Sequence, residues 1–140
     1  MITQRLKTIF LISLLIIYIH GFEEIIGGFQ HVDTFMMFGA NLFSISTEIF
    51  YWSSHLIWWL AIPLLYLIFK NKPKILLLLG LYGLVFVVEL HHVVKAVQLG
   101  SYYPGAITAL FYPIIGFFFW REWLLNFKNK SVAERQVETG

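Results

Sequence analysis

The pattern of hydrophobic and polar positions predicts four helices that are long enough to cross a membrane. Apolar residues run with few interruptions through four stretches, 8–27, 50–69, 75–98 and 104–125. Each stretch is close to the ~20 residues that a helix needs to span the hydrocarbon core of a bilayer. Gly27-Gly28, Pro73 and Gly100 lie where the first three stretches end. The pattern therefore predicts an all-α membrane protein with four transmembrane helices.

Prolines within the apolar stretches indicate local features of these helices. Pro104 suits the first turn of the fourth helix, where its missing N–H has no intrahelical partner. Pro63 and Pro113 lie further inside the second and fourth stretches, and we expect each to kink its helix rather than end it.

The connection between the first two helices and the C-terminal end have different characters. Residues 35–38 and 40–43 of the connection are apolar, which predicts a short helix that lies at the outer membrane surface or re-enters the membrane. The last residues are polar. We therefore expect one membrane domain over residues 1–127 and a polar, solvated or disordered tail over 128–140.

Composition agrees with a membrane location and excludes several classes of site. Hydrophobic residues make up 59% of the 140 residues and charged residues only 13%, about half the share usual in soluble domains. The absence of cysteine excludes disulfides and thiolate ligands. A formal net charge of +2 is too small to indicate a nucleic-acid partner.

The distribution of basic residues predicts the orientation. All Lys and Arg residues except Lys95 lie before the first stretch, between the second and third, or at and beyond the end of the fourth. Basic residues mark the cytoplasmic side of membrane proteins. Both termini are therefore expected in the cytoplasm.

Ionisable residues interrupt the apolar stretches at one depth. The first stretch contains the sequence His20-Gly21-Phe22-Glu23-Glu24. A charge at the centre of a membrane helix costs about 2.5 to 3.5 kcal/mol on insertion scales, so such residues usually face the protein interior and serve a function. At a helical rise of about 1.5 Å per residue, the ionisable residues of three stretches all lie about 18 to 25 Å from the cytoplasmic end. They are His20, Glu23 and Glu24, then His55, then Glu89 and His92.

The residue types in this layer predict a metal site. Imidazole and carboxylate groups are ligands for Zn²⁺, Fe²⁺ and Mn²⁺. Glu89-x-x-His92 has the spacing used by di-iron helical bundles, and His20-x-x-Glu23 is the same pair reversed. We predict one or two divalent ions, Zn or Fe, held by residues among His20, Glu23, Glu24, His55, Glu89 and His92, with Glu48 just above this layer. His31 and Asp33 are expected to be solvated loop residues, and His91 and Lys95 to have structural roles.

The motifs resemble those of the HXXEE-motif family of small bacterial membrane proteins. The resemblance rests on His20-x-x-Glu23-Glu24, on Glu89-Leu90-His91-His92 and on the sequence from Tyr103 to Thr108. It covers residues 8 to 118 and implies that Tyr103, Pro104, Gly105 and Thr108 belong to the site or its frame. It also implies a bacterial inner membrane location. Many members have asparagine at the position of Glu89, so the resemblance does not imply an obligatory ligand there. No activity is established for the family.

Three classes of function remain open from the sequence. The first is a membrane-embedded metal-dependent hydrolase or oxidoreductase that acts on a lipid-like or small hydrophobic substrate, with Glu23 or Glu24 as general base. The second is an oligomeric, proton-coupled transport component. The third is a non-catalytic accessory protein that holds a metal or a haem. The histidines and glutamates could also simply neutralise each other as packing pairs.

Overall fold

The first apolar stretch forms one unbroken helix, α1 (Gln4–Gly27), in a computed structural model that describes residues 2–72 and 74–138, with side chains described as far as residue 130. The side chain of Thr3 caps the N-terminus by accepting a hydrogen bond of 3.3 Å from the N–H of Leu6. Gly28 ends the helix in the left-handed conformation, with φ +71°, which glycine adopts without strain.

The second stretch is a helix with a π-helical turn in its middle. It consists of α4 (Thr47–Leu56), η1 (Ile57–Ala61) and α5 (Ile62–Phe69). Pro63 has no N–H to donate to the carbonyl of Trp59, four residues earlier. The hydroxyl of Tyr18 on α1 donates to that carbonyl instead. The predicted disturbance at Pro63 is therefore a π turn whose freed carbonyl is bonded by another helix.

The third stretch is divided into three helical pieces, α6 (Ile75–Gly83), α7 (Val85–Val88) and α8 (His91–Leu99). Turns at Leu84 and at Glu89-Leu90 separate them. The stretch Ile75–Leu99 nevertheless continues in one direction and counts as one long apolar helix.

The fourth stretch differs from its prediction. A continuous helix over 104–125 with a kink at Pro113 is wrong, because the chain forms a short helix, α9 (Ala106–Ala109), then a turn, and then α10 (Tyr112–Glu138). A continuous helix would need an N–H from Pro113 at the carbonyl of Ala109, and proline has none. In the observed structure Pro113 lies in the first turn of α10, where this lack costs nothing.

The polar tail predicted over 128–140 is helical in the part that the structure describes. The backbone of α10 continues to Glu138. Residues 139–140 and the side chains from 131 onward lie outside the described part of the chain. The division into a domain over 1–127 and a separate tail stays a prediction.

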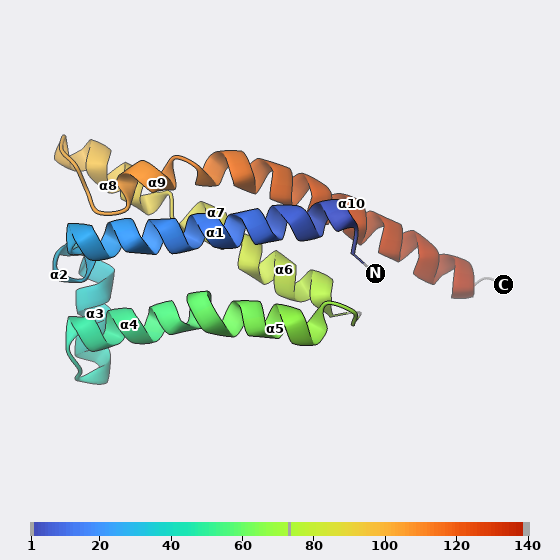
Figure 1. Cartoon of the computed structure of the whole chain (residues 1–140), viewed down its shortest axis with the longest axis horizontal. Coiled ribbons are helices and arrows are strands. Elements are labelled where there is room, and N and C mark those ends of the chain that lie inside the picture. The colour runs from blue at the N-terminus through green and yellow to red at the C-terminus, as the bar shows by residue number, and fades with distance from the viewer. Residues whose placement is uncertain (1, 73, 139–140) are drawn as a thin grey trace.

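The connection between α1 and α4 is helical as well. It consists of α2 (Phe29–Val32) and α3 (Thr34–Phe43), separated by Asp33. Asp33 caps α3 through hydrogen bonds of 2.9 Å from the N–H groups of Phe35 and Met36. Figure 1 shows α3 lying across the end of α1 and α4 rather than along them.

The helices of the four stretches run side by side along the long axis of the molecule (Figure 1). The N-terminus and the C-terminal part of α10 lie toward one end, and α2 and α3 lie at the other. Within the described residues, three helices are long and apolar enough to cross a membrane: Gln4–Gly27, Thr47–Phe69 and Ile75–Leu99. This architecture is consistent with an integral membrane protein.

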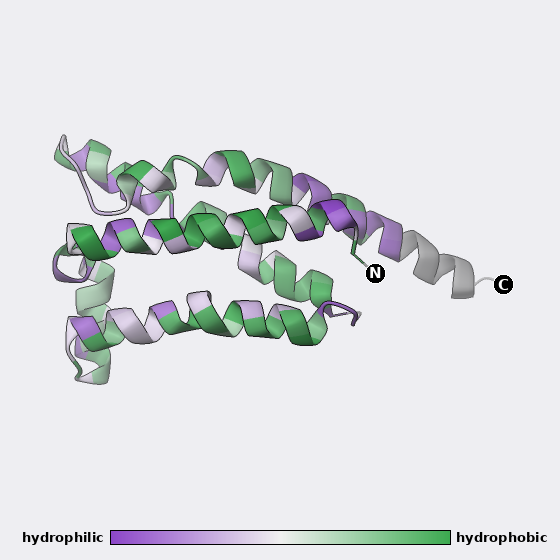
Figure 2. Cartoon of the chain, viewed as in Figure 1, coloured by the Kyte–Doolittle hydropathy of each residue, from purple (hydrophilic) through white to green (hydrophobic). Residues whose placement is uncertain are grey.

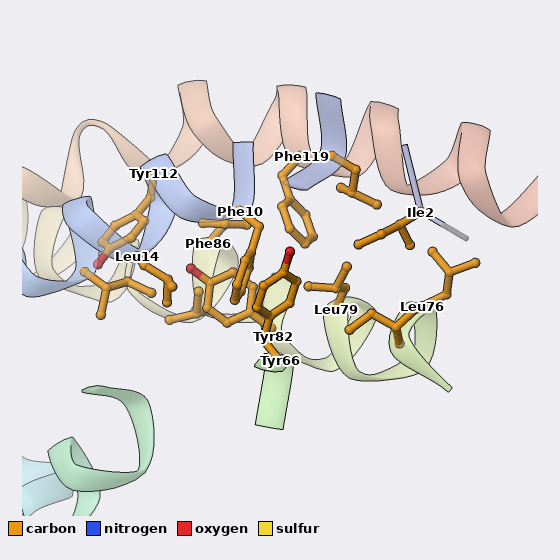
Figure 3. Close-up of a cluster of buried hydrophobic side chains, with 14 of the residues drawn as sticks. Ile2, Phe10, Leu14, Tyr66, Leu76, Leu79, Tyr82, Phe86, Tyr112 and Phe119 are labelled. Carbon is orange, nitrogen blue, oxygen red and sulfur yellow. The ribbon is translucent and has the colours of Figure 1, made fainter. Parts of the chain in front are cut away.

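An apolar core fills the molecule between the site and the N-terminal end of α1. Figure 3 shows Phe10 and Leu14 of α1 packed with Tyr82 of α6 and Phe119 of α10. The buried hydroxyl of Ser13 is paired with the hydroxyl of Tyr82 at 2.7 Å. Hydrophilic positions of α1, α4 and α8 recur near the opposite end, where α2 and α3 lie (Figure 2).

Candidate metal centre

Four side chains of ligand type meet between α1 and the turn that joins α7 to α8. His20 and Glu24 lie one helical turn apart on α1, and Glu89 and His92 come from the turn and from the start of α8. Each offers one ligand atom, and these atoms all lie within 4.8 Å of one another. His20, Glu24 and His92 are buried, with 4%, 3% and 0% of their surfaces exposed. We call these four residues the His/Glu cluster.

The separations within the His/Glu cluster match those of ligands around one ion. Nε2 of His20 lies 3.2 Å from Oε2 of Glu89 and 3.6 Å from Oε1 of Glu24. Nε2 of His92 lies 3.1 Å from each of the same two oxygens. Ligands bonded tetrahedrally at about 2.0 to 2.2 Å stand about 3.3 to 3.6 Å apart. These four separations are close to that spacing, and the remaining pairs of ligand atoms lie within 4.8 Å of each other, so the longer pairs would have to close in for all four residues to surround one divalent ion.

Hydrogen bonds on the far side of each ring fix the tautomer of both histidines. Nδ1 of His92 lies 2.5 Å from the carbonyl oxygen of Pro104, which can only accept, so Nδ1 carries a proton and donates it. Nδ1 of His20 lies 2.7 Å from Oγ1 of Thr108. The Thr108 hydroxyl donates its own proton to Glu23 at 2.5 Å, so it accepts from His20. Both rings thus turn Nε2 toward the carboxylates, the arrangement that outer hydrogen bonds impose on metal-binding histidines.

Glu23, predicted as a ligand or base, is placed outside the His/Glu cluster. Its carboxylate accepts hydrogen bonds from the N–H groups of Ile107 and Thr108, at 3.1 and 2.8 Å, and from the hydroxyl of Tyr102 at 3.1 Å. Glu23 therefore anchors α9 to α1. Through Thr108 it also orients His20.

His55 approaches the His/Glu cluster from α4 through Glu24. Its Nε2 lies 2.8 Å from Oε2 of Glu24, while Nδ1 donates to the carbonyl oxygen of Tyr51 at 2.9 Å. The hydroxyl of Tyr51 donates to the same carboxylate oxygen at 3.3 Å. Glu24 thus has one oxygen toward His92 and the other toward His55. A second ion, if present, would have Glu24 as the bridge between the two positions.

Two glycines allow the close packing around the histidines. A Cβ on Gly105 would lie 2.6 Å from Nδ1 of His92 and 2.8 Å from Cε1 of His20, and Gly105 has φ +85°. A Cβ on Gly21 would lie 2.2 Å from the ring of Trp59. Any larger residue at either position would move a ring that forms the site.

Glu48 and Tyr103 contribute no ligand atom to the His/Glu cluster, although the ring of Tyr103 lies beside that of His92, with centroids 5.9 Å apart. Glu48 is exposed, 3.9 Å from the exposed His31. Tyr103 is buried and donates a hydrogen bond of 2.8 Å to Asp33. Burial, together with this hydrogen bond and the charge of Asp33, raises the pKa of Tyr103, so it remains a neutral donor. The prediction that Asp33 is solvated is wrong, because Asp33 is 2% exposed and serves as the cap of α3.

A cavity of about 690 Å³ opens beside the His/Glu cluster. His20, Glu24, Glu89 and His55 lie in its wall, and most of the remaining lining is apolar. Trp58 and Trp59 of η1 contribute one side and Leu81, Leu84 and Val88 the other. Those last three side chains are also half or more exposed on the molecular surface. The cavity is therefore open sideways, between the second and third helical stretches.

Sequence reasoning missed two tyrosines beside the predicted site residues, Tyr51 against Glu24 and His55, and Tyr112 in the cavity wall. Tyr51 precedes His55 by one helical turn, which is the only signal that could have indicated it. Tyr112 of α10 is fully buried, lines the cavity, and packs its ring edge-on against His20 with centroids 5.1 Å apart. Its hydroxyl has no hydrogen-bond partner in the described part of the chain. Nothing in the local sequence distinguishes Tyr112 from the other aromatic residues of this stretch.

Comparison with known proteins agrees with the motif. A family model described as "Protein of unknown function with HXXEE motif" matches residues 11–119. The motif corresponds to His20, Glu23 and Glu24. The matched region includes all four residues of the His/Glu cluster as well as Thr108. No curated protein and no solved structure matches the chain.

Proposed function

The chain belongs to the HXXEE-motif family, for which no function is known, and from the geometry of its site we propose that it is a membrane-embedded metal-dependent enzyme. The His/Glu cluster is its metal centre, and its substrate is lipid-like or a small hydrophobic molecule that reaches the centre through the lateral cavity. The reaction is a hydrolysis if the ion is zinc and an oxidation if it is iron.

The observation that carries the proposal is the orientation of His20 and His92. With Nδ1 protonated on both rings, a neutral imidazole turns the lone pair of Nε2 toward carboxylate oxygens 3.1 to 3.6 Å away. A nitrogen lone pair that faces a negatively charged carboxylate oxygen is repelled by it. A divalent cation between them converts this repulsion into coordination by two nitrogen and two oxygen ligands.

The chain offers a proton acceptor next to this centre. A divalent ion held by the His/Glu cluster would polarise a substrate carbonyl or lower the pKa of a water ligand. His55 is bonded to Glu24 at 2.8 Å and lines the cavity, so the pair can take a proton from a group in the cavity and hold it between them. In this assignment Glu24 is both ligand and part of the base, and Glu23 is a positioning residue for His20.

The cavity favours an enzyme over a non-catalytic metal-binding or accessory protein. Four protein ligands close a structural metal site, whereas a catalytic site keeps a position for water or substrate, so catalysis here would need one of the four cluster ligands to leave the ion or the ion to take a fifth ligand from the cavity. Here the ligand-bearing wall faces a space of about 690 Å³. This space is large enough for a drug-sized ligand.

The apolar core disfavours the transport alternative. A proton relay needs ionisable groups along a path to the other side. Between the His/Glu cluster and the N-terminal end of α1, the described core is built from side chains such as Leu6, Phe10, Leu14 and Leu79. The buried polar pair within this core, Ser13 with Tyr82, is neutral. The buried Glu122 lies at the N-terminal end of α1, where it pairs with Arg5 at 3.3 Å, and does not connect to the His/Glu cluster through other described ionisable groups.

We further propose that α10 is the fourth membrane span and that both termini are cytoplasmic. Lys70, Lys72 and Lys74 lie in the connection between α5 and α6, and Figure 1 places this connection toward the same end of the molecule as the N-terminus. The His/Glu cluster then lies in the outer half of the bilayer. The transverse helix α3, with exposed Phe35 and Phe38, lies in the outer interface. A bacterial inner membrane suits the family resemblance.

Metal analysis of the detergent-purified protein tests the proposal. After growth with added zinc or iron, we expect about one ion per chain. His20→Ala, His92→Ala and Glu24→Gln should each fall below ~0.2 ion per chain, because a ligand set of this kind rarely holds metal tightly with one member missing. His31→Ala, which changes an exposed histidine that is not part of the His/Glu cluster, is the control and should keep its metal. Wild-type protein that stays below ~0.2 ion per chain after supplementation would leave the histidines and glutamates as packing pairs.

A further inference from the structure

The cavity beside the His/Glu cluster has two ends of different character. Toward the N-terminal end of the third stretch it is lined by Leu81 and Leu84, with Trp58 opposite. Toward the other end it is lined by His91 and Lys95, by Asp33, and by the side chains of Phe35 and Met36 of α3. Glu89 lies between these ends, about 12 Å along the helix from Leu81 and about 9 Å from Lys95. A ligand that fills the cavity therefore needs an apolar part, a reactive part and a polar part in that order.

Lys95 is a half-buried cation with no partner in the described part of the structure. The carboxylates that also line the cavity are engaged elsewhere. Glu24 and Glu89 face the histidines of the His/Glu cluster. Asp33 receives hydrogen bonds from two N–H groups of α3 and from Tyr103, and it lies 3.8 Å from His91. The ammonium group of Lys95 is thus available to a ligand.

The charge balance of the cavity favours an anion at this end. A divalent ion in the His/Glu cluster neutralises the two negative charges of Glu24 and Glu89. The charge of Asp33 is offset in part by its helix N-terminus and by Tyr103. The ammonium group of Lys95 then has no carboxylate in direct contact within the described structure, and in this half-buried wall its attraction for an anion is stronger than in water.

The size and opening of the cavity favour a ligand with a single hydrocarbon chain. A volume of about 690 Å³ is within the range of pockets that hold one drug-sized ligand. Leu81, Leu84 and Val88 are 58%, 51% and 62% exposed although they line the cavity, so a chain can enter from the surrounding hydrocarbon. The orphan hydroxyl of Tyr112 lies in the same wall, beside His20. Figure 3 shows this hydroxyl pointing away from α10, into the interior of the molecule.

We propose that the cavity binds a single-chain anionic amphiphile as the substrate of the proposed enzyme. The anionic group lies at Lys95, the chain lies along Leu81 and Leu84, and a polar atom between them accepts a hydrogen bond from Tyr112 near the metal centre. Alkyl phosphates, lysophospholipids and fatty acids share this chemistry. The inference rests on the proposed function for the role of the ligand as substrate.

Equilibrium binding to the whole protein in lipid nanodiscs tests the proposal. The probes are radiolabelled dodecyl phosphate, dodecanoate and dodecyl glucoside, which share one chain, and binding to empty nanodiscs is subtracted. We expect the two anions to bind at least about tenfold more tightly than the glucoside, a difference of about 1.4 kcal/mol. A preference for dodecyl phosphate over dodecanoate would indicate a phosphate headgroup, and the reverse would indicate a fatty acid; either supports the proposal.

Matched variants distinguish the effect of the Lys95 charge on binding from a general effect of substitution on the fold. Lys95→Gln should reduce the preference for anions to about twofold or less, while Lys70→Gln, an exposed lysine outside the cavity, should leave it unchanged. Leu84→Phe should weaken all three probes alike, because it fills the apolar end. Equal binding of glucoside and anions, or an unchanged preference in Lys95→Gln, would overturn the proposal.

The metal content of the same samples distinguishes this inference from the proposed function. If the protein prefers the anionic probes but holds no metal, the anionic amphiphile is a ligand of the cavity and the proposed enzyme function is wrong. If the protein holds about one ion per chain but binds the glucoside and the anions equally, the proposed metal centre stands and this class of substrate is wrong.

Discussion

The hydroxyl of Thr108 donates a hydrogen bond of 2.5 Å to the carboxylate of Glu23, and this bond sets the role of the same hydroxyl toward His20 of the His/Glu cluster. Because its proton is given to Glu23, the same hydroxyl accepts from Nδ1 of His20 at 2.7 Å. One residue on α9 thereby determines which nitrogen of His20 faces the carboxylates. Three of the predictions below depend on such supporting contacts rather than on the ligands themselves.

Thr108→Val should weaken metal binding without removing any ligand. Valine has the shape of threonine but offers His20 no acceptor, so the ring loses its fixed tautomer and orientation. Loss of such an outer partner typically costs about 10- to 100-fold in metal affinity. Thr108→Ser retains the hydroxyl and should remain within about threefold of wild type. Competition titration against a chelator of known affinity measures both, and equal affinities for the two variants would contradict the relay through Thr108.

Gly105→Ala should disrupt the site more than its backbone strain explains. A Cβ at this position would lie 2.6 Å from His92 and 2.8 Å from His20. Gly100 provides a matched control, since it also has a positive φ, +61°, but its added Cβ would meet nothing within 4 Å. Both alanine variants bear the cost of a left-handed residue, about 1 kcal/mol.

Metal stoichiometry and thermal unfolding distinguish the two glycine variants. Gly100→Ala should lose a little stability and keep its metal. Gly105→Ala should lose most of its metal at the concentration that saturates the control. If both variants keep their metal equally, contact between Gly105 and the histidines is unimportant for the site.

Tyr18→Phe should destabilise the packing of α1 against the second stretch. Its hydroxyl is the donor to the carbonyl of Trp59, which cannot receive the α-helical hydrogen bond from position 63 because that residue is proline. A buried carbonyl left unsatisfied costs about 1 to 3 kcal/mol. In a Pro63→Ala background the alanine supplies an N–H, so the same substitution should cost less. Unfolding in mixed micelles measures the four proteins of this double-mutant cycle, and identical costs in both backgrounds would show that the proline and the tyrosine are not coupled.

The four-span topology can be tested with reporter fusions. Fusions after Lys74 and after Lys130 should both report the cytoplasm, because basic residues collect at these connections. A fusion within residues 30–45 should report the outside. A cytoplasmic signal from that region, or an external signal after Lys130, would rule out α10 as the fourth span and would place the His/Glu cluster at another depth.

Much of the architecture follows from one-dimensional properties of the chain. A run of about 20 apolar residues forms a helix in a membrane because no water is present to satisfy its backbone, so three of the four predicted helices are long apolar helices in the structure. Helical rise also places residues at predictable depths. His20, His55 and Glu89 therefore lie at one level before anything is known of their neighbours. The family resemblance is confirmed on the same residues.

Which of these residues meet is decided by the tertiary structure. Glu23 and Glu24 are adjacent, and a rotation of about 100° per residue sends them to different partners. Glu24 turns to His92 and His55, whereas Glu23 turns to the N–H groups of α9. Periodicity gives the direction of a side chain about its own helix axis, but it does not give the positions of the neighbouring helices around it.

The breaks in the helices could likewise not be predicted from the local sequence pattern. The turn at Glu89-Leu90 and the separation of α9 from α10 let Glu89, Pro104 and Thr108 reach the two histidines from different directions. The sequence by itself determined which residues are apolar, where helices form and that histidines and glutamates share one depth, because these depend on local chemistry and length. Only the tertiary structure decided which carboxylate is a ligand and which is a support, because that depends on packing between residues as far apart as Glu24 and His92 in the chain.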